Sequence, residues 1–554
     1  MTSNSLKIIP LGGLGAIGKN MMALEFGPDI VIIDAGILFP EENMPGVDFA
    51  IPDITYLIDN KEKVKALLIT HGHEDHIGAI PYILPELNIP IYASRLTHGL
   101  ITVKLREHGK LSDARLNVIE PNSPFKIGQF EVEFFRVCHS IPDAMGIAVT
   151  TPLGIVVHTG DFKIDHTPVD GKTTDFSTLS RLSSQGVLLL CSDSTYAEVE
   201  GYTPSEQIVG KALDRAIGDA GGRVIVATFA SLISRMQQVI NAATKHNRKI
   251  TIVGRSMVNN LKMATKMGYL NVPDGAVIPI KEASKLQDHE IVIMATGAQG
   301  EPTSALVRIS NREHQDIEII NGDTVVISSS PIPGNETLIS KTIDNLSRQG
   351  AKVLYSRTAL VHVHGHGSRE ELKMILSLVK PKFFLPVHGE YRHLVAHASI
   401  AQSTGVPESN TFVLEDGDVL ELEPESAIVG KKVKAGHKFV GGKRIWEPQD
   451  SLLKERKKMA REGIIIVIAT VDKITGKLIN PPDIVSRGFM EINDNQELFK
   501  KTVEETKNIL EVKSTNGLNW NEIEIDITKS ISDFIYNETR RRPKVLARIE
   551  KISL

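Results

Sequence analysis

The segment His71-Gly72-His73-Glu74-Asp75-His76 decides the fold, and it directly follows the apolar run VKALLIT. Imidazole and carboxylate groups at these spacings suit a divalent metal ion, because both offer lone pairs to it. On an extended chain His71 and His73 point the same way, whereas Asp75 and His76 fall at the following turn. Four ligands within six residues crowd a single centre. The pattern therefore favours two adjacent ions, which two-metal hydrolases hold about 3.5–4 Å apart.

Three further polar residues stand where apolar runs end, and they supply what two ions need. His139 follows EVEFFRVC, Asp161 ends GIVVHTGD, and His388 follows FFLPV. Asp161 is placed to bridge the ions, since a carboxylate can give one oxygen to each. With the first segment, these residues make a site of five histidines and two aspartates. Because no cysteine takes part, the sequence disfavours a structural zinc knot and leaves Zn²⁺ or Mn²⁺ open.

Composition places the chain among ordinary globular proteins. Of its 554 residues 41% are hydrophobic and 23% charged, which excludes disorder as the main state. The 63 Lys and Arg against 67 Asp and Glu give a net charge of −4, which argues against a histone-like or strongly basic binding protein but leaves a local basic patch open. Cys138 and Cys191 follow apolar stretches and are expected to be buried thiols. With no signal peptide and no apolar run of about 20 residues, we expect a cytoplasmic protein without a membrane segment.

The glycines of Gly13-Leu14-Gly15-Ala16-Ile17-Gly18 match G-x-G-x-x-G but do not indicate a dinucleotide site. Such a site needs a helix directly after the glycines, with the pyrophosphate at its N-terminus. The next segments, Met21–Phe26 and Ile30–Ile33, read instead as two strands joined by a Gly-Pro-Asp turn. We therefore expect the glycines to form tight turns.

The sequence pattern changes twice, which predicts an inserted domain. Strands predominate up to about residue 204, and a helix over 76–84 is expected after the first metal-binding segment. Beyond that point helical and strand patterns alternate, which indicates a parallel sheet flanked by helices. Strand-end histidines return near residue 353, so the first domain resumes there. The predicted parts are 1–204 and 353–430 for one domain, 205–352 for its insertion, 431–461 for a basic linker, and 462–554 for a small C-terminal α/β domain.

The metal-binding segments carry a family resemblance. HGHEDHIG at 71–78, His139, HTGD at 158–161 and the late His388 resemble the metallo-β-lactamase fold, and the middle block is similar to that of the β-CASP nucleases. The likeness narrows to the bacterial ribonuclease J family and spans most of residues 7–393. The motifs that carry it are IPLGGLGAIGKNMM, GVDFAIPD, SDSTYAE, ATFAS, TGAQGEP, SSSPIPGNE, VHVHGHGS and PVHGEYRH.

The resemblance implies an α/β metallo-β-lactamase αββα sandwich interrupted by a β-CASP α/β domain. It also implies two divalent metal ions per subunit, with Zn²⁺ expected and Mn²⁺ or Mg²⁺ as alternatives, and a hydroxide that attacks phosphorus in line. Asp193 would orient or relay protons near the metals, and His366 would protonate the leaving ribose oxygen. The implied ligands are His71, His73 and His139 for the first ion, Asp75, His76 and His388 for the second, and Asp161 as the bridge.

A phosphate-binding stretch is also implied, and in the family such a pocket recognises a 5′-monophosphate. The sequence departs from the family at His364, where relatives have a small hydroxyl residue, and at Ser231–Arg235, where they often carry Asn and His before the arginine. His364 is expected to add a phosphate contact or to face the core. The residues expected to surround an RNA phosphate are His362, Val363, His364, Gly365 and His366, with further donors from Ser328, Ser329 and Ser330.

The function that the resemblance implies is a metal-dependent ribonuclease. It would have 5′→3′ exonuclease and endonuclease activity on single-stranded RNA and would act in rRNA maturation and mRNA decay. It would form a homodimer or homotetramer and bind other RNA-decay proteins. Three alternatives stay open. A small-substrate hydrolase would leave the inserted block without a purpose. A DNA-directed nuclease stays open because contacts to the 2′-hydroxyl cannot be read from sequence. The full ligand set argues against an inactive RNA-binding subunit.

Overall fold

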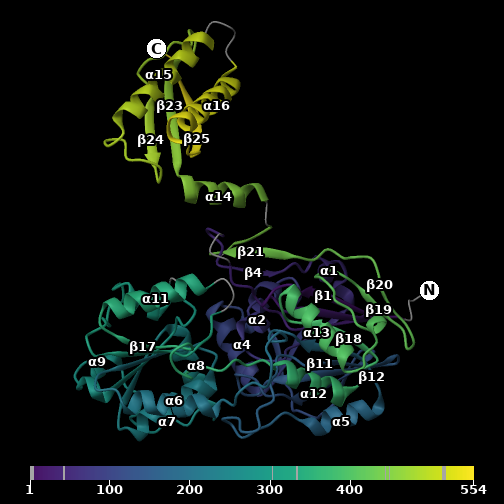
Figure 1. Ribbon diagram of the computed structural model, residues 1–554. Helices are drawn as coiled ribbons and strands as arrows, with labels where there is room; N and C mark the ends of the chain where they lie inside the picture. Colours follow the sequence, from purple (N-terminus) through teal and green to yellow (C-terminus); the bar gives the residue numbers. More distant parts are fainter. Residues whose placement is uncertain are drawn as a thin grey trace. The chain divides into compact units, whose positions relative to one another are not determined.

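The structure is a computed structural model, and it describes residues 5–40, 44–301, 303–331, 335–442, 444–447, 450–513 and 519–553. The chain forms two compact units (Figure 1). The larger unit comprises residues 1–39 and 48–443, and the smaller comprises 40–47 and 444–554. None of the helices formed by the described residues has the length and apolarity that crossing a lipid bilayer requires.

Two β-sheets packed face to face form the first domain, because apolar side chains of both sheets share one buried cluster. Leu24 and Val31 of one sheet and Phe134, Ile147 and Leu189 of the other belong to it. One sheet runs in the order β20 (Ala427–Val429), β19 (Leu420–Leu422), β1 (Leu6–Gly12), β2 (Met21–Phe26), β3 (Asp29–Ile33), β5 (Val64–Leu68), β6 (Pro90–Ala93), β7 (Arg115–Val118). The other runs β18 (Phe383–Val387), β12 (Val187–Asp193), β11 (Gly154–His158), β10 (Met145–Thr151), β9 (Phe130–Arg136), β8 (Phe125–Ile127).

Helices pack against this pair of sheets and complete the predicted αββα sandwich (Figure 1). α4 (Arg95–Glu107) packs on β6 and β7, and α13 (Tyr391–Ser403) packs on β18. α12 (Arg369–Val379) lies beside α13 and α5 (Phe176–Gln185). The predicted fold class is therefore confirmed, and strands from both halves of the chain stand side by side: β12 pairs in parallel with β18.

The inserted domain is built on a five-stranded sheet whose strand pairs are all parallel, as predicted. The three central strands, β15, β13 and β16, are buried along their whole length, so helices must cover both faces of the sheet there. The strands run in the order β14 (Lys249–Val253), β15 (Ile291–Ala295), β13 (Val224–Ala227), β16 (Thr324–Ile327), β17 (Lys352–Leu354), with helices α6 (Gln207–Gly218), α7 (Ile233–Lys245), α8 (Arg255–Lys266), α10 (Ala305–Ser310) and α11 (Glu336–Arg348).

The chain after the first metal-binding segment differs from the single helix predicted over 76–84. It forms two short helices, α2 (Glu74–Ile77) and α3 (Ile80–Ile83), and α2 begins before His76. Pro81 has no N–H to continue a hydrogen-bonded ladder, so a new helix starts with it near the first position. The expectation for the glycine loop is confirmed, because β1 and β2 pair antiparallel and Gly13, Gly15 and Gly18 all have positive φ.

The stretch predicted as a basic linker carries regular structure. β21 (His437–Gly441), β22 (Arg444–Trp446) and α14 (Asp450–Glu462) all fall within or across 431–461. The prediction rested on charge density, but a helix tolerates many Lys and Arg on its solvent face.

The C-terminal domain is a three-stranded sheet with two helices. β23 (Ile464–Asp472) alternates between buried and half-buried side chains, as a strand with one covered face does. Its helices are α15 (Gln496–Lys513) and α16 (Trp520–Thr539), and α16 buries isoleucines four residues apart, such as Ile523, Ile527 and Ile531. β24 (Asp483–Arg487) and β25 (Lys544–Ile552) were not predicted, since their apolar residues are interrupted by charges.

Glu371, on the first turn of α12, joins three separate segments around the site. Its fully buried carboxylate accepts hydrogen bonds from the backbone N–H groups of Ile164 (2.7 Å), Thr203 (2.7 Å) and Ser368 (2.8 Å). An ionised carboxylate can accept all three bonds, because it offers only acceptor lone pairs.

We expect Glu371→Gln to destabilise the larger unit by about 1–3 kcal/mol, because the amide NH₂ would face a buried backbone donor. Thermal unfolding should show a lower midpoint for this variant. The matched control is Glu370→Gln, since Glu370 forms a partly exposed pair with Lys373 that is worth well under about 1 kcal/mol. Equal midpoints for the two variants would contradict this assignment of Glu371.

Candidate active site

The metal-ligand candidates lie just beyond the carboxyl ends of strands in the sandwich. β5 precedes His71, β9 precedes His139, β11 precedes Asp161 and β18 precedes His388. Strand ends anchored in a buried core hold side chains rigidly, so residues distant in sequence meet at one edge. The structure brings the seven predicted ligands together in two adjacent clusters, in each of which the ligand atoms lie within 4.8 Å of one another.

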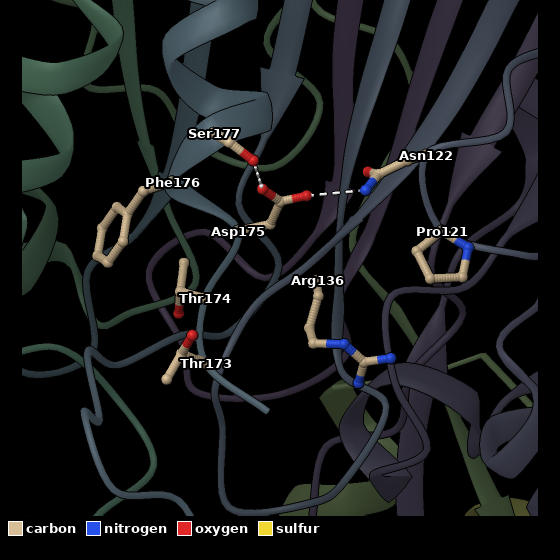
Figure 2. A pocket seen from close by; sticks show the side chains of 8 residues that line it. All are labelled: Pro121, Asn122, Arg136, Thr173, Thr174, Asp175, Phe176 and Ser177. Atoms are coloured by element: carbon tan, nitrogen blue, oxygen red, sulfur yellow. Dashed lines mark hydrogen bonds between the residues drawn. The ribbon is translucent and has the colours of Figure 1, made fainter. Parts of the chain in front are cut away.

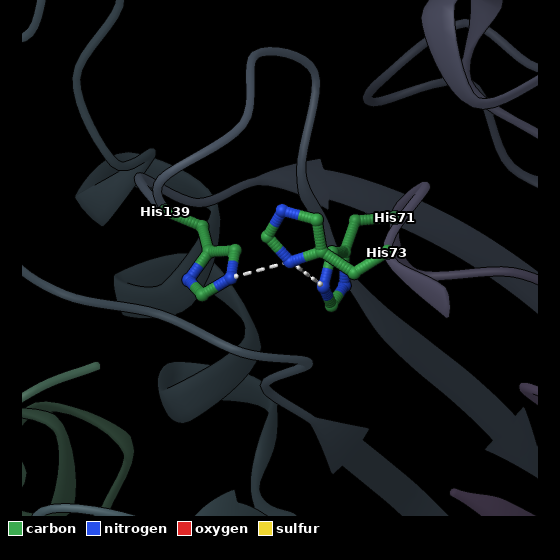
Figure 3. A group of neighbouring side chains, drawn as sticks. All are labelled: His71, His73 and His139. Carbon is green, nitrogen blue, oxygen red and sulfur yellow. Dashed lines mark hydrogen bonds between the residues drawn. The ribbon is translucent and has the colours of Figure 1, made fainter. Parts of the chain in front are cut away.

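The first cluster consists of His71, His73 and His139. His73 Nδ1 lies 3.1 Å from His71 Nε2 and 3.2 Å from His139 Nε2 (Figure 3). Burial is the main cause that lowers the pKa of all three rings, to about 4 for His73. The rings are therefore uncharged at neutral pH, and their converging lone pairs are available to a cation.

The second cluster consists of Asp75, His76, Asp161 and His388. Asp161 Oδ2 lies 3.2 Å from His76 Nε2 and 3.3 Å from His388 Nε2, and it is 3.7 Å from His71 Nε2 of the first cluster. Burial would raise the pKa of Asp161, but His388 and His76 outweigh it and hold that pKa well below its usual range. An ionised oxygen thus stands between the two groups of imidazoles.

The donor set fits divalent cations. His388 Nε2 is buried and makes no well-aligned hydrogen bond among the described residues, although the Asp161 carboxylate lies 3.3 Å away. A buried polar nitrogen without a partner is costly, so its lone pair is expected to serve a ligand. Five imidazoles and two carboxylates are the donors that Zn²⁺ and Mn²⁺ accept in proteins.

Asp34 and Thr70 hold two of these imidazoles from behind. Asp34 Oδ2 lies 2.7 Å from His76 Nδ1, and it accepts a hydrogen bond from the Thr70 hydroxyl at 2.8 Å. Thr70 Oγ1 in turn lies 3.1 Å from His71 Nδ1. Such contacts set which ring nitrogen carries the proton and leave the other free for a metal. Asp34 thus contacts the His76 imidazole directly and the His71 imidazole through Thr70.

Asn20 holds His388 in the same way, and sequence reasoning missed it. Asn20 Oδ1 accepts from His388 Nδ1 at 2.8 Å, while its Nδ2 donates to the Asp75 carbonyl at 3.1 Å. His388 itself has φ +53°, which residues with a Cβ rarely adopt. The only local signal for Asn20 was its place directly after the glycine loop. Asn20 therefore connects two proposed ligands, Asp75 and His388, that lie far apart in the sequence.

The structure also brings Asp193 and His366 together beside the clusters. Asp193 Oδ2 lies 2.7 Å from His366 Nδ1, and Asp161 Oδ2 is 3.9 Å from the same nitrogen. Burial would lower the pKa of His366, but Asp193 and then Asp161 outweigh it and raise the pKa to about 9. His366 is therefore protonated at neutral pH in this arrangement, as a general acid must be.

The stretch 362–366 passes directly over the first cluster. The Gly365 carbonyl accepts from His139 Nδ1 at 2.6 Å, and a Cβ on Gly365 would lie 2.5 Å from the His139 ring, so only glycine fits there. Val363 is buried. His362 Nδ1 is buried without a partner among the described residues, and burial followed by the nearby Arg235 charge lowers its pKa well below the usual range.

The predicted serine donors are engaged with the protein. The Ser328 hydroxyl donates to the Val361 carbonyl at 2.6 Å, and the Ser329 hydroxyl donates to the Ala298 carbonyl at 2.8 Å. Arg235 also contacts Ser328 and forms a buried ion pair with Glu206. A role of Ser328, Ser329 and Ser330 in phosphate binding stays a prediction, and for the first two it would require the hydroxyl groups to turn.

A separate pocket of about 420 Å³ lies at the start of α5, away from the ligand clusters (Figure 2). Asp175 in this pocket accepts hydrogen bonds from Ser177, Thr178 and Asn122, and although burial opposes them these bonds lower its pKa to about 2. Thr174 at its rim accepts from the Cys138 N–H at 3.0 Å. Thr174 thus anchors the chain directly before His139, and the Asp175 carboxylate is satisfied by neighbouring protein groups.

Four family models match the chain. The metallo-beta-lactamase superfamily matches residues 17–193, the ribonuclease J beta-CASP domain matches 221–346, the Zn-dependent metallo-hydrolase RNA specificity domain matches 350–413, and the ribonuclease J C-terminal domain matches 451–552. Together they run from the glycine loop to the last strand. Strands β13 to β16 of the inserted sheet are matched by the beta-CASP family model, whereas His366 and His388 are matched by the RNA specificity model.

Relatives match along nearly the whole chain. Ribonuclease J2 of Bacillus subtilis is 40% identical over 99% of both chains. Ribonuclease J of Synechocystis is 44% identical over 99% of this chain and 87% of its own, and that of Thermus thermophilus is 43% identical over 98% and 94%. A solved structure, a protein of unknown function from Enterococcus faecalis V583, matches 76% of this chain and 100% of its own with a TM-score of 0.53 at 15% identity, which shows a shared fold alone.

We expect Asn20→Ala to weaken the binding of one divalent ion by roughly 10- to 100-fold, because His388 would lose the partner that orients its ring. Calorimetric titration of metal-stripped protein with Zn²⁺ or Mn²⁺ measures this directly and needs no activity. Asn60→Ala is a matched control, since Asn60 Nδ2 bonds only the Tyr56 carbonyl at the end of a short helix. Unchanged affinity at both steps of the Asn20→Ala titration would contradict the assignment.

Proposed function

The chain belongs to the ribonuclease J family, and from this premise we propose that it is a two-metal ribonuclease that degrades single-stranded RNA from the 5′ end and also cleaves it internally. The family places the chain among metal-dependent hydrolytic nucleases. The proposed parts are the number of ions, the direction of degradation, the preference for a 5′-monophosphate and the roles in rRNA maturation and mRNA decay.

One observation carries the two-metal part of the proposal, namely the position of Asp161. Its Oδ2 lies within 4 Å of imidazole nitrogens from both clusters, so one carboxylate can serve two ions. We assign His71, His73 and His139 to one ion, and Asp75, His76 and His388 to the other. Divalent ions held there would lower the pKa of water and neutralise charge on the phosphate oxygens.

Asp193 and His366 complete the chemistry with the protein's own groups. In-line attack on phosphorus expels a ribose oxygen, which leaves most easily if it receives a proton. Protonated His366 would supply that proton, while Asp193 holds the ring through Nδ1 and favours its charged form. The opposite nitrogen, Nε2, is then the one directed at substrate.

The substrate is assigned from the surroundings of this pair. The stretch 362–366, where the first domain resumes, and Ser328–Ser330 of the inserted domain would surround the terminal phosphate. Assembly into a homodimer or homotetramer and contacts with other RNA-decay proteins stay predictions. A DNA-directed nuclease and an inactive RNA-binding subunit are the outcomes that a substrate test must separate.

The test is a time course on one 3′-labelled RNA that carries a 5′-monophosphate, 5′-triphosphate or 5′-hydroxyl, with Mn²⁺ or Mg²⁺ added. We expect loss of full-length RNA without intermediates, fastest from the monophosphate. His73→Ala and Asp75→Ala should abolish cleavage but retain RNA binding, because they remove ligands and leave the surface intact. Discrete fragments that do not depend on the 5′ end would refute the directional part, and binding without any cleavage would favour the inactive subunit.

The pH dependence tests the role of the Asp193–His366 pair. Asp193 is the largest influence that raises the pKa of His366 against burial, so Asp193→Asn should lower that pKa from about 9. A general acid is lost as the pH rises through its pKa, and the alkaline limb of kcat/KM should therefore move to lower pH. Metal content, measured in parallel, should stay equal to that of the unaltered protein. An unmoved alkaline limb would exclude His366 as the acid.

A further inference from the structure

Three aromatic rings stand nearly parallel beside the proposed acid. The His364 and Tyr196 rings have centroids 3.7 Å apart at an interplanar angle of 9°, and Tyr196 lies 5.8 Å from His366 at 11°. Tyr196 follows β12 by three residues, so it belongs to the same loop that Asp193 begins. His364 and Tyr196 are both only partly buried. The stack therefore lies beside the proposed acid and is partly open to solvent, so a nucleotide next to the cleaved bond would contact it.

The hydrogen bond that His364 makes determines what its free nitrogen can do. His364 Nδ1 lies 2.8 Å from the His366 carbonyl oxygen, and a carbonyl can only accept. Nδ1 must therefore carry the proton, so in the neutral ring Nε2 offers a lone pair. Among the described residues no group donates to this nitrogen. Nε2 is thus an acceptor without a hydrogen-bond donor in the part of the chain that the structure describes.

This arrangement does not suit a phosphate, which was one expectation for His364. The non-bridging oxygens of a phosphodiester are acceptors, and two acceptors facing each other repel. A ribose 2′-hydroxyl is a donor, and it is present in every nucleotide of RNA and absent from DNA. Amino groups of the bases are donors too, but they would impose a sequence preference on every cleavage.

We propose that His364 Nε2 accepts a hydrogen bond from the ribose 2′-hydroxyl of a nucleotide adjacent to the cleaved phosphate, and that the His364–Tyr196 ring pair supports this nucleotide. His364 is then a residue that makes the enzyme select RNA over DNA. The inference rests on the proposed ribonuclease function and deepens it, because it names the chemical group by which the substrate is recognised. Stacking of a nucleotide on an aromatic pair is a common mode of binding single strands.

The experiment measures the affinity of full-length protein, with its metals retained, for a fluorescent 5′-monophosphate RNA whose phosphorothioate linkages resist hydrolysis. A series of oligonucleotides replaces one ribose at a time by 2′-deoxyribose. For the native protein we expect a loss of about 3- to 10-fold at one position, the size of one hydrogen bond. His364→Leu should bind the all-ribose RNA as weakly as the native protein binds that oligonucleotide, with no further loss at the same position.

Two more variants separate recognition from folding. His98→Leu makes the same replacement at a partly buried histidine on α4, distant from the catalytic pair in sequence, and should reproduce the native profile. His364→Gln provides an amide oxygen as acceptor and should recover part of the dependence on the deoxy position. A nonspecific disturbance of the site would weaken all oligonucleotides equally and recover nothing.

The inference is overturned if His364→Leu keeps the deoxy penalty, if the native protein shows none, or if affinity follows the identity of the base rather than the sugar. Cleavage of the unmodified RNA with Mn²⁺ is assayed separately. Loss of cleavage with a persistent, His364-dependent deoxy penalty would refute the proposed activity and leave the contact standing. The two proposals can therefore fail independently.

Discussion

The structure depends on the hydrogen bonds that lie behind the imidazoles of the proposed metal ligands. A buried imidazole can serve a cation only if its other nitrogen is satisfied, because either nitrogen can carry the proton. Asp34, Thr70, Asn20 and the Gly365 carbonyl each supply such a partner, and each comes from a different stretch of chain. The sandwich can be understood as the scaffold that brings these partners to one edge. The packing of the sandwich therefore fixes which nitrogen of each imidazole carries the proton, in addition to stabilising the fold.

The same demand explains why charged groups are buried here without destabilising the fold. Asp161 and Asp193 are nearly inaccessible, yet imidazoles face both of them and lower their pKa values against the effect of burial. Glu371 is fully buried and accepts hydrogen bonds from three backbone N–H groups that would otherwise lack acceptors. Each carboxylate therefore has partners that match its lone pairs, which is the condition for keeping a charge inside a protein.

The sequence predicted those features whose cause is local. The proposed ligands could be found because four of them share one six-residue segment and the other three stand at the ends of apolar runs. The inserted sheet could be found from alternating helix and strand patterns. Asn20 could not be found, since its partner His388 lies 368 positions away. The break between α2 and α3 was overlooked although Pro81 marks it. The serine hydroxyls at 328 and 329 were assigned to phosphate because their backbone acceptors belong to loops that only the fold brings near.

The insertion between the two halves of the sandwich has a consequence for synthesis of the chain. Six of the seven proposed ligands precede residue 162, whereas His388 follows the whole inserted domain, as does His366. Ribosomes add about 5–20 residues per second, so on the order of ten seconds or more separates Asp161 from His388. During that interval the nascent chain lacks both the last proposed ligand and the proposed acid. The order of residues along the chain therefore delays completion of the proposed site until the inserted domain has been synthesised.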